Sequence, residues 1–193
     1  NMGVDRERGR QPVFLPGAIS HLVPRRLVCY RAVPMLIQET HRWTGRIIVT
    51  RYLRSSRGLM IPVEVIEVEN LIVSAGRNAA RDAFRQVDIG IRYMAWGTGV
   101  TAPAATQTTL VTETGRKAVT SQTTGATGVL TTTTYLSATD ANGTLAELGW
   151  FAGTGATATA GTGIMMARVL FPGGTHVKTS LEAFNVDRVD TFT

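Results

Sequence analysis

From residue 44 onward the sequence alternates apolar and polar residues over short stretches, which turn-forming and small residues interrupt. The first two stretches, residues 45–53 and 60–69, flank Ser-Ser-Arg-Gly at 55–58 and predict a hairpin. Asp-Ala-Asn-Gly at 140–143 predicts a tight type I′ hairpin turn. Further strands are expected at residues 91–97, 116–123, 128–138, 144–151, 163–171, 176–184 and 186–193. Short strands joined by small-residue loops predict a mainly β fold, an antiparallel, jelly-roll-like β-sandwich.

One segment departs from this two-residue period. Between residues 72 and 87, small and apolar residues recur at the spacing of a helix. Arg77, Arg81 and Arg85 follow one another in four-residue steps on another face. We therefore expect one helix near 72–87 within a body that spans residues 44–193.

Residues 1–43 have a different composition. Prolines recur at positions 12, 16, 24 and 34, and each removes a backbone donor and disfavours helix. The first 57 residues hold eleven arginines against three acidic residues, whereas the whole chain has a net charge of +6. The sequence therefore predicts an extended, basic N-terminal arm (residues 1–43) joined to a nearly neutral body.

The glycine-containing stretch at Gly97-Thr98-Gly99 first suggests a phosphate site. A phosphate-binding loop needs a lysine at a fixed spacing and a following helix, and the sequence offers neither here. Cys29 is the single cysteine, and the three histidines lack ligand spacing. We assign no catalytic, cofactor-binding or metal residues and expect no enzyme.

Membrane association is also not expected. No apolar run approaches the roughly 18 residues that span a bilayer, and the charged N-terminus has no apolar segment of a secretory signal. The single thiol is consistent with synthesis in a reducing cytoplasm.

The arm is the candidate partner-binding segment. Aromatic residues and arginines provide most anchoring contacts at protein interfaces. The candidate anchors are Arg25, Arg26, Tyr30, Arg31 and Trp43. Because the arginines are dispersed among apolar residues, a protein partner is favoured over nucleic acid. The alternative is that Trp43 and Tyr30 cover the core of the body itself.

A second set of candidates lies in the body. Glu113, Arg116 and Glu147 could form an ion pair between a loop and the sheet. Its role would be structural, either within one subunit or between subunits, where buried pairs determine register more than affinity.

The order of several short motifs resembles a loose family of tailed-bacteriophage structural proteins. The motifs are Asn-Leu-Ile-Val at 70–73, Gly76, Gly-Thr-Gly at 97–99, Thr-Ala-Pro at 101–103, Leu110, Glu113, Arg116, Glu147, Gly149 and Ala-Arg at 167–168. They cover residues 44–193, and the first 43 residues have no counterpart.

The resemblance implies an oligomeric, β-rich virion component that binds other virion proteins and is synthesised in the host cytoplasm. A place in the tail, baseplate or fibre-attachment region is expected, with docking through the arm. Two alternatives stay open: a decoration protein on the capsid, and a receptor- or glycan-binding module that uses loops 98–109 and 152–163.

Overall fold

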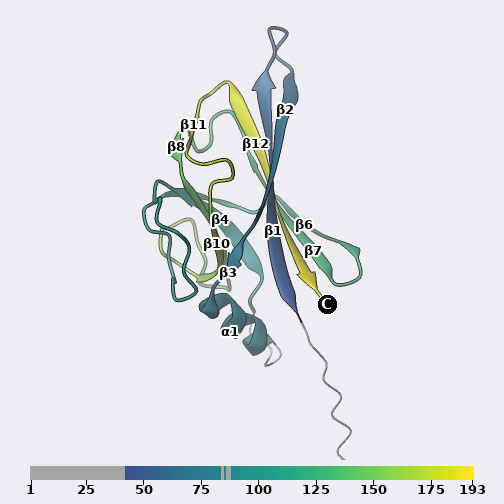
Figure 1. Ribbon diagram of the computed structural model, residues 1–193, viewed down its shortest axis with the longest axis vertical. Helices are drawn as coiled ribbons and strands as arrows, with labels where there is room; N and C mark the ends of the chain where they lie inside the picture. The colour runs from purple at the N-terminus through teal and green to yellow at the C-terminus, as the bar shows by residue number, and fades with distance from the viewer. Residues whose placement is uncertain (1–41, 84, 86–87) are drawn as a thin grey trace, which may run out of the picture. The chain divides into compact units, whose positions relative to one another are not determined.

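The computed structural model describes residues 42–193, except residues 84, 86 and 87. Four of the five candidate anchors of the arm, Arg25, Arg26, Tyr30 and Arg31, lie outside the described residues. The described chain is mainly β, with antiparallel sheets packed against each other and one short helix. The predicted fold class, an antiparallel β-sandwich body with one helix, is confirmed (Figure 1).

Two five-stranded sheets make up the body. The first contains, in spatial order, β2 (Met60–Glu69), β1 (Trp43–Arg54), β12 (Glu182–Phe192), β7 (Val129–Leu136) and β6 (Ser121–Ala126). The second contains β3 (Leu71–Ile72), β10 (Ile164–Leu170), β9 (Glu147–Ala152), β4 (Ile91–Gly97) and β5 (Glu113–Ala118). A small sheet pairs β11 (His176–Lys178) with β8 (Gly143–Leu145), and α1 (Ser74–Ala83) packs against β10.

The longest ladder joins the beginning and the end of the body. β1 pairs antiparallel with β12, from Trp43 opposite Phe192 to Leu53 opposite Glu182. On β1 the alternation buries Ile47 and Val49. Because its two strands stand at opposite ends of the body in sequence, this pairing is a non-local contact.

The core lies between the two sheets. Ile47, Val49, Phe184 and Val186 contribute from the first sheet, and Met94, Leu148, Trp150, Met166 and Ala167 from the second. Helix α1 approaches β10 closely because Gly76 faces the backbone of Met166, where a Cβ atom would clash. The helix thereby covers one end of the second sheet (Figure 1).

Two predicted strands are each divided in the structure. The segment predicted at 116–123 forms β5 and β6, which belong to different sheets. The segment predicted at 144–151 forms β8 and β9, again in different sheets. In both cases residues that favour strands continue across a change of sheet, which the local sequence pattern does not register.

The boundaries of the helix and of the last strands also differ from the prediction. Residues 71–72 form β3, and the described helix extends from Ser74 to Ala83. The last two predicted strands, 176–184 and 186–193, become the short β11 and one long strand, β12.

The predicted hairpin at Asp-Ala-Asn-Gly is wrong. The strands on its two sides, β7 and β8, lie in different sheets and do not pair with each other. The turn is instead held by Asp140, which accepts hydrogen bonds from the Ser137 backbone N–H (2.8 Å) and hydroxyl (2.6 Å) and from Lys117 Nζ (2.5 Å). Among the described residues, Ala141, at φ 54°, is the non-glycine residue in the left-handed region. With these contacts the turn leads the chain from the first sheet into the small sheet and does not form a hairpin within a single sheet.

Candidate assembly interface

The loop between β4 and β5 is organised around one buried carboxylate. Glu147, at the start of β9, accepts hydrogen bonds from the backbone N–H groups of Gly99 (3.1 Å), Val111 (3.0 Å) and Thr112 (2.7 Å). The side chain is fully buried. A Cβ atom at Gly99 would lie 2.5 Å from Glu147 Oε1, so a glycine is required there. The Gly-Thr-Gly motif therefore serves loop packing around a carboxylate.

Arg168 on β10 neutralises this carboxylate. Its Nε donates to Glu147 Oε2 at 2.7 Å, and both side chains are fully buried. The same guanidinium donates to Gln107 Oε1 (3.1 Å) and to the Thr101 carbonyl (2.9 Å). The loop from 98 to 112 is thus tied to the second sheet at several points, and each buried charge of the pair is compensated by the other.

Glu113 and Arg116 form a separate cluster. Arg116 is bidentate to Glu113, through Nε to Oε1 at 2.5 Å and Nη2 to Oε2 at 2.9 Å. Its Nη1 donates to the carbonyls of Thr157 (3.1 Å) and Thr162 (2.9 Å), and its Cζ lies 4.2 Å from the centroid of the Phe151 ring. The structure therefore brings two of the three predicted partners together, whereas Glu147 pairs with Arg168.

This second cluster holds the low-complexity loop that follows β9. Gly161 N–H donates to Glu113 Oε2 at 3.2 Å, so both members of the pair contact the loop. The Thr162 hydroxyl accepts from Thr157 N–H at 3.0 Å and closes the loop internally.

Sequence analysis did not identify Arg168 as the partner of Glu147, although the Ala-Arg motif at 167–168 contained this arginine.

Trp43 is part of the described body. Its ring stacks on Phe192, with centroids 5.4 Å apart and an interplanar angle of 22°. Its Nε1 donates to Asp190 Oδ1 at 2.9 Å, and Asp190 in turn accepts from Arg188 Nη2 at 2.7 Å. One side of Trp43 therefore packs against the core, as a residue covering the body would do.

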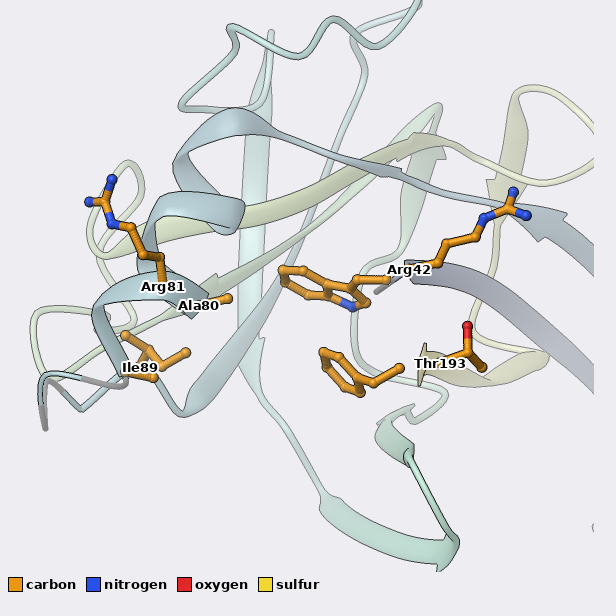
Figure 2. Close-up of a pocket in the computed structure, with 8 residues that line it drawn as sticks. Arg42, Ala80, Arg81, Ile89 and Thr193 are labelled. Atoms are coloured by element: carbon orange, nitrogen blue, oxygen red, sulfur yellow. The ribbon is translucent and has the colours of Figure 1, made fainter. Parts of the chain in front are cut away.

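The other side of Trp43 lines an apolar groove of about 820 Å³ (Figure 2). The groove lies between α1 and the paired ends of β1 and β12. Its described lining consists of Arg42, Trp43, Ala80, Arg81, Ala83, Ile89, Phe192 and Thr193. Apart from Arg42, Arg81 and Thr193, the described lining residues are small or apolar, and Arg42 and Arg81 lie at its margin (Figure 2). The sequence indicated the helix stripe but not the Phe192 ring that faces it.

A smaller hollow of about 110 Å³ lies on the inner side of β2. His176, at its edge, contacts both Glu182 carboxylate oxygens at 3.2 and 3.3 Å. Arg51 bridges Glu182 (3.1 Å) and Glu64 (2.9 Å). Burial by itself raises the pKa of Glu182, but hydrogen bonds from Thr179 N–H, Arg51 and His176 outweigh it and lower that pKa.

The neighbouring Lys178 is also buried. Its Nζ donates to the Ser137 carbonyl (2.8 Å) and Asn142 Oδ1 (3.0 Å). Burial lowers the pKa of Lys178, against the attraction of Glu182 and Asp140. These hydrogen bonds connect the small sheet with the turn after β7, so Lys178 stabilises the position of that turn.

Within the described residues no group of three or more histidine, cysteine and acidic side chains is arranged to hold a metal ion. The helix that the structure describes is too short and too polar to cross a membrane. Comparison with protein-family models, with curated proteins and with solved structures found no match to this chain.

Proposed function

We propose that this chain is a structural component of a tailed-phage virion, in the tail, baseplate or fibre-attachment region. It oligomerises and docks through its N-terminal arm onto other virion proteins, and it carries out no catalysis. The observation that carries the proposal is the apolar groove beside Arg42, where the arm joins the body.

The groove has the composition of a docking site. Trp43 and Phe192 present aromatic surface, and Phe192 is 47 % exposed although it is a large apolar residue. Aromatic residues and arginines are the side chains that anchor protein interfaces. Since Arg42 and Arg81 border the groove, a partner segment with apolar residues flanked by carboxylates fits it best.

The buried loop clusters support the same function in a different way. Glu147 with Arg168, and Glu113 with Arg116, fix two long loops of small residues through buried ion pairs. Rigid loops on a sandwich suit a component that must present one fixed surface to its neighbours.

A glycan-binding module receives less support. Trp150 and Phe151, two of the aromatic residues that flank the candidate loops, are fully buried, and Trp96 is half-buried against the core. Sugar rings stack on exposed aromatic faces, which these residues do not offer.

The test is to purify phage particles and measure this chain in them by quantitative mass spectrometry. We expect a few to tens of copies per particle, and immunogold labelling at the tail. Hundreds of copies with label on the head would assign the chain to capsid decoration instead. Absence from purified particles would refute a virion role altogether.

A variant pair tests the groove. Ala80→Trp fills the groove from the helix side, whereas Asn78→Trp adds the same ring to an exposed position of the same helix that does not line it. We expect incorporation into particles to fall at least about tenfold for the first variant only, which corresponds to roughly 1.4 kcal/mol. Equal incorporation of the two would show that the groove is not a docking site.

A further inference from the structure

Strand β2 exposes apolar side chains along most of its length. Val65 is 66 % exposed, Ile61 49 % and Val63 45 %, although β-branched residues in strands usually pack against a neighbour. In Figure 1 the hairpin of β1 and β2 extends beyond the rest of the sandwich. This apolar surface is therefore available to a partner.

The backbone of β2 has a free side as well. In the part of the chain that the structure describes, β2 pairs only with β1 and forms the edge of the first sheet. Pro62 interrupts the edge near the hairpin end, but residues 63–69 contain no proline. Beyond Pro62 the free backbone groups of this edge are a template for another strand, and the charged side chains along it restrict which strand can pair.

The charges along this edge select the partner. Residues 63–69 carry Glu64, Glu67 and Glu69, all exposed, and no basic residue. On β1, Arg51 and Arg46 pair with Glu64 and Glu67 at 2.9 and 2.8 Å, and the glutamates stay about half exposed. The excess charge on this edge is negative, so a strand with basic residues between apolar ones is favoured.

Residues 25–33 of the arm, Arg-Arg-Leu-Val-Cys-Tyr-Arg-Ala-Val, have this composition. They contain three arginines and no acidic residue, with apolar and β-branched residues between them. The groove beside Arg42 is a poor acceptor for them, since Arg42 and Arg81 carry the same charge. We propose that residues 25–33 of a second copy of this chain pair with the β2 edge at residues 63–69.

This inference rests on the oligomerisation through the arm in the proposed function and names its acceptor. Strand addition uses main-chain hydrogen bonds for affinity, and the exposed valines and glutamates of β2 provide the specificity. The eight residues 34–41, which link the proposed segment to Arg42, span at most about 26 Å when extended.

The first experiment uses the single native cysteine, which lies in the middle of the proposed segment. A Val65→Cys variant of the full chain, oxidised under mild conditions, should form disulfides between Cys29 of one copy and position 65 of another. Such a bond requires Cα atoms within about 7 Å. Dimers and larger species should appear on non-reducing gels and disappear when Cys29 is replaced by serine.

The matched control is Val177→Cys, because Val177 is similarly exposed (62 %) but lies on β11. Mass spectrometry of the cross-linked peptides must show the bond from 29 to 65. Cross-linking no stronger than in the control, or a bond confined to single chains, overturns the proposal. Circular dichroism of both variants verifies that they fold.

A second experiment needs no cross-link. Val65→Lys should weaken self-association of the full chain at least about tenfold in sedimentation velocity, since an edge lysine opposes strand addition and repels the arginines. Val177→Lys should leave it unchanged. Equal self-association of the two variants overturns the proposal.

The outcomes separate this inference from the proposed function. Loss of self-association in Val65→Lys, with the chain absent from purified particles, would support the strand contact and refute the virion role. Normal self-association in that variant, with the chain present in particles, would refute the strand contact and support the virion role.

Discussion

Two regions of this protein use the same kinds of residue in opposite ways. Around Glu147, a carboxylate and a guanidinium are fully buried and bind a loop of small residues. On the β1–β2 hairpin, Arg46 with Glu67 and Arg51 with Glu64 form pairs of comparable length, but both pairs stay partly exposed. The first region fixes the shape of the loops on the body, and the second leaves charged side chains accessible to solvent.

The energetic difference follows from solvation. Removing one member of a buried pair leaves an uncompensated charge, which costs about 3–5 kcal/mol, whereas exposed pairs contribute about 0–1 kcal/mol. The comparison teaches that a charged pair stabilises this fold strongly where it is buried and weakly where it is exposed.

The largest effect is expected for Glu147→Gln. The neutral side chain of glutamine cannot neutralise Arg168. Its NH2 group is a donor and would face the backbone N–H donors of Gly99, Val111 and Thr112. We expect the free energy of unfolding, measured in urea, to fall by about 3 kcal/mol.

The matched change on the hairpin is Glu67→Gln, which should alter the free energy of unfolding by less than about 1 kcal/mol. Similar losses in the two variants would erase the distinction between the regions.

Gly99→Ala should have the next largest effect. The added Cβ would lie 2.5 Å from Glu147 Oε1 and 2.6 Å from Val111 Cβ, so the loop must shift away from the carboxylate. We expect a loss of about 2 kcal/mol in the free energy of unfolding. Gly155→Ala is the control, because nothing lies within 4 Å of its Cβ position, and it should change stability by less than about 0.5 kcal/mol.

Trp43→Phe tests the polar contact beside the groove. Phenylalanine keeps the stack on Phe192 but removes the donor to Asp190, which is almost fully buried and whose Oδ2 has no partner among the described residues. A loss of about 1–2 kcal/mol is expected in thermal unfolding. An unchanged unfolding temperature would mean that water from the groove replaces the contact. Tyr135→Phe, at an exposed position of β7, is the control for the loss of a polar group from an aromatic ring.

The smallest effect is a dependence on pH through Glu182. Its pKa lies below the ordinary 4.5, because Thr179 N–H, Arg51 and His176 stabilise the carboxylate more than burial opposes it. The contribution of Glu182 to stability is therefore complete above pH 4.5, the ordinary pKa that applies in the unfolded chain. It is lost as the pH falls through the lower pKa of the folded state. Urea titrations between pH 3 and 6 should show a shallower decline for Glu182→Gln than for the native chain. Parallel declines would exclude Glu182 as a source of acid sensitivity.

Much of the fold was predictable because its signals are local. The strands at Met60–Glu69 and Ile91–Gly97 have the predicted bounds, since alternation and turn residues mark both of their ends. The helix was recognisable from its small-residue stripe, although its predicted start included β3. The turn at Asp-Ala-Asn-Gly was misread because its contacts, from Lys117 and Ser137, come from outside the four residues.

The candidate site was less predictable, because its residues come together only through the fold. Glu113 and Arg116 are three residues apart, and their pairing was within reach of the sequence. Glu147 and Arg168 meet because β9 and β10 are neighbours in the second sheet. The groove requires α1 to lie opposite Trp43 and Phe192, which are at the two ends of the body.

The sequence by itself determined most of the strands, the position of the helix, and the uneven distribution of charge between the first 57 residues and the rest of the chain. Each of these depends on residues close together in the chain, whose periodicity, charge and backbone freedom can be read directly. The tertiary structure alone decided which strands pair, which arginine neutralises Glu147, and that β2 remains an open edge. Those outcomes depend on packing between distant segments, where burial makes one pairing far more favourable than the others.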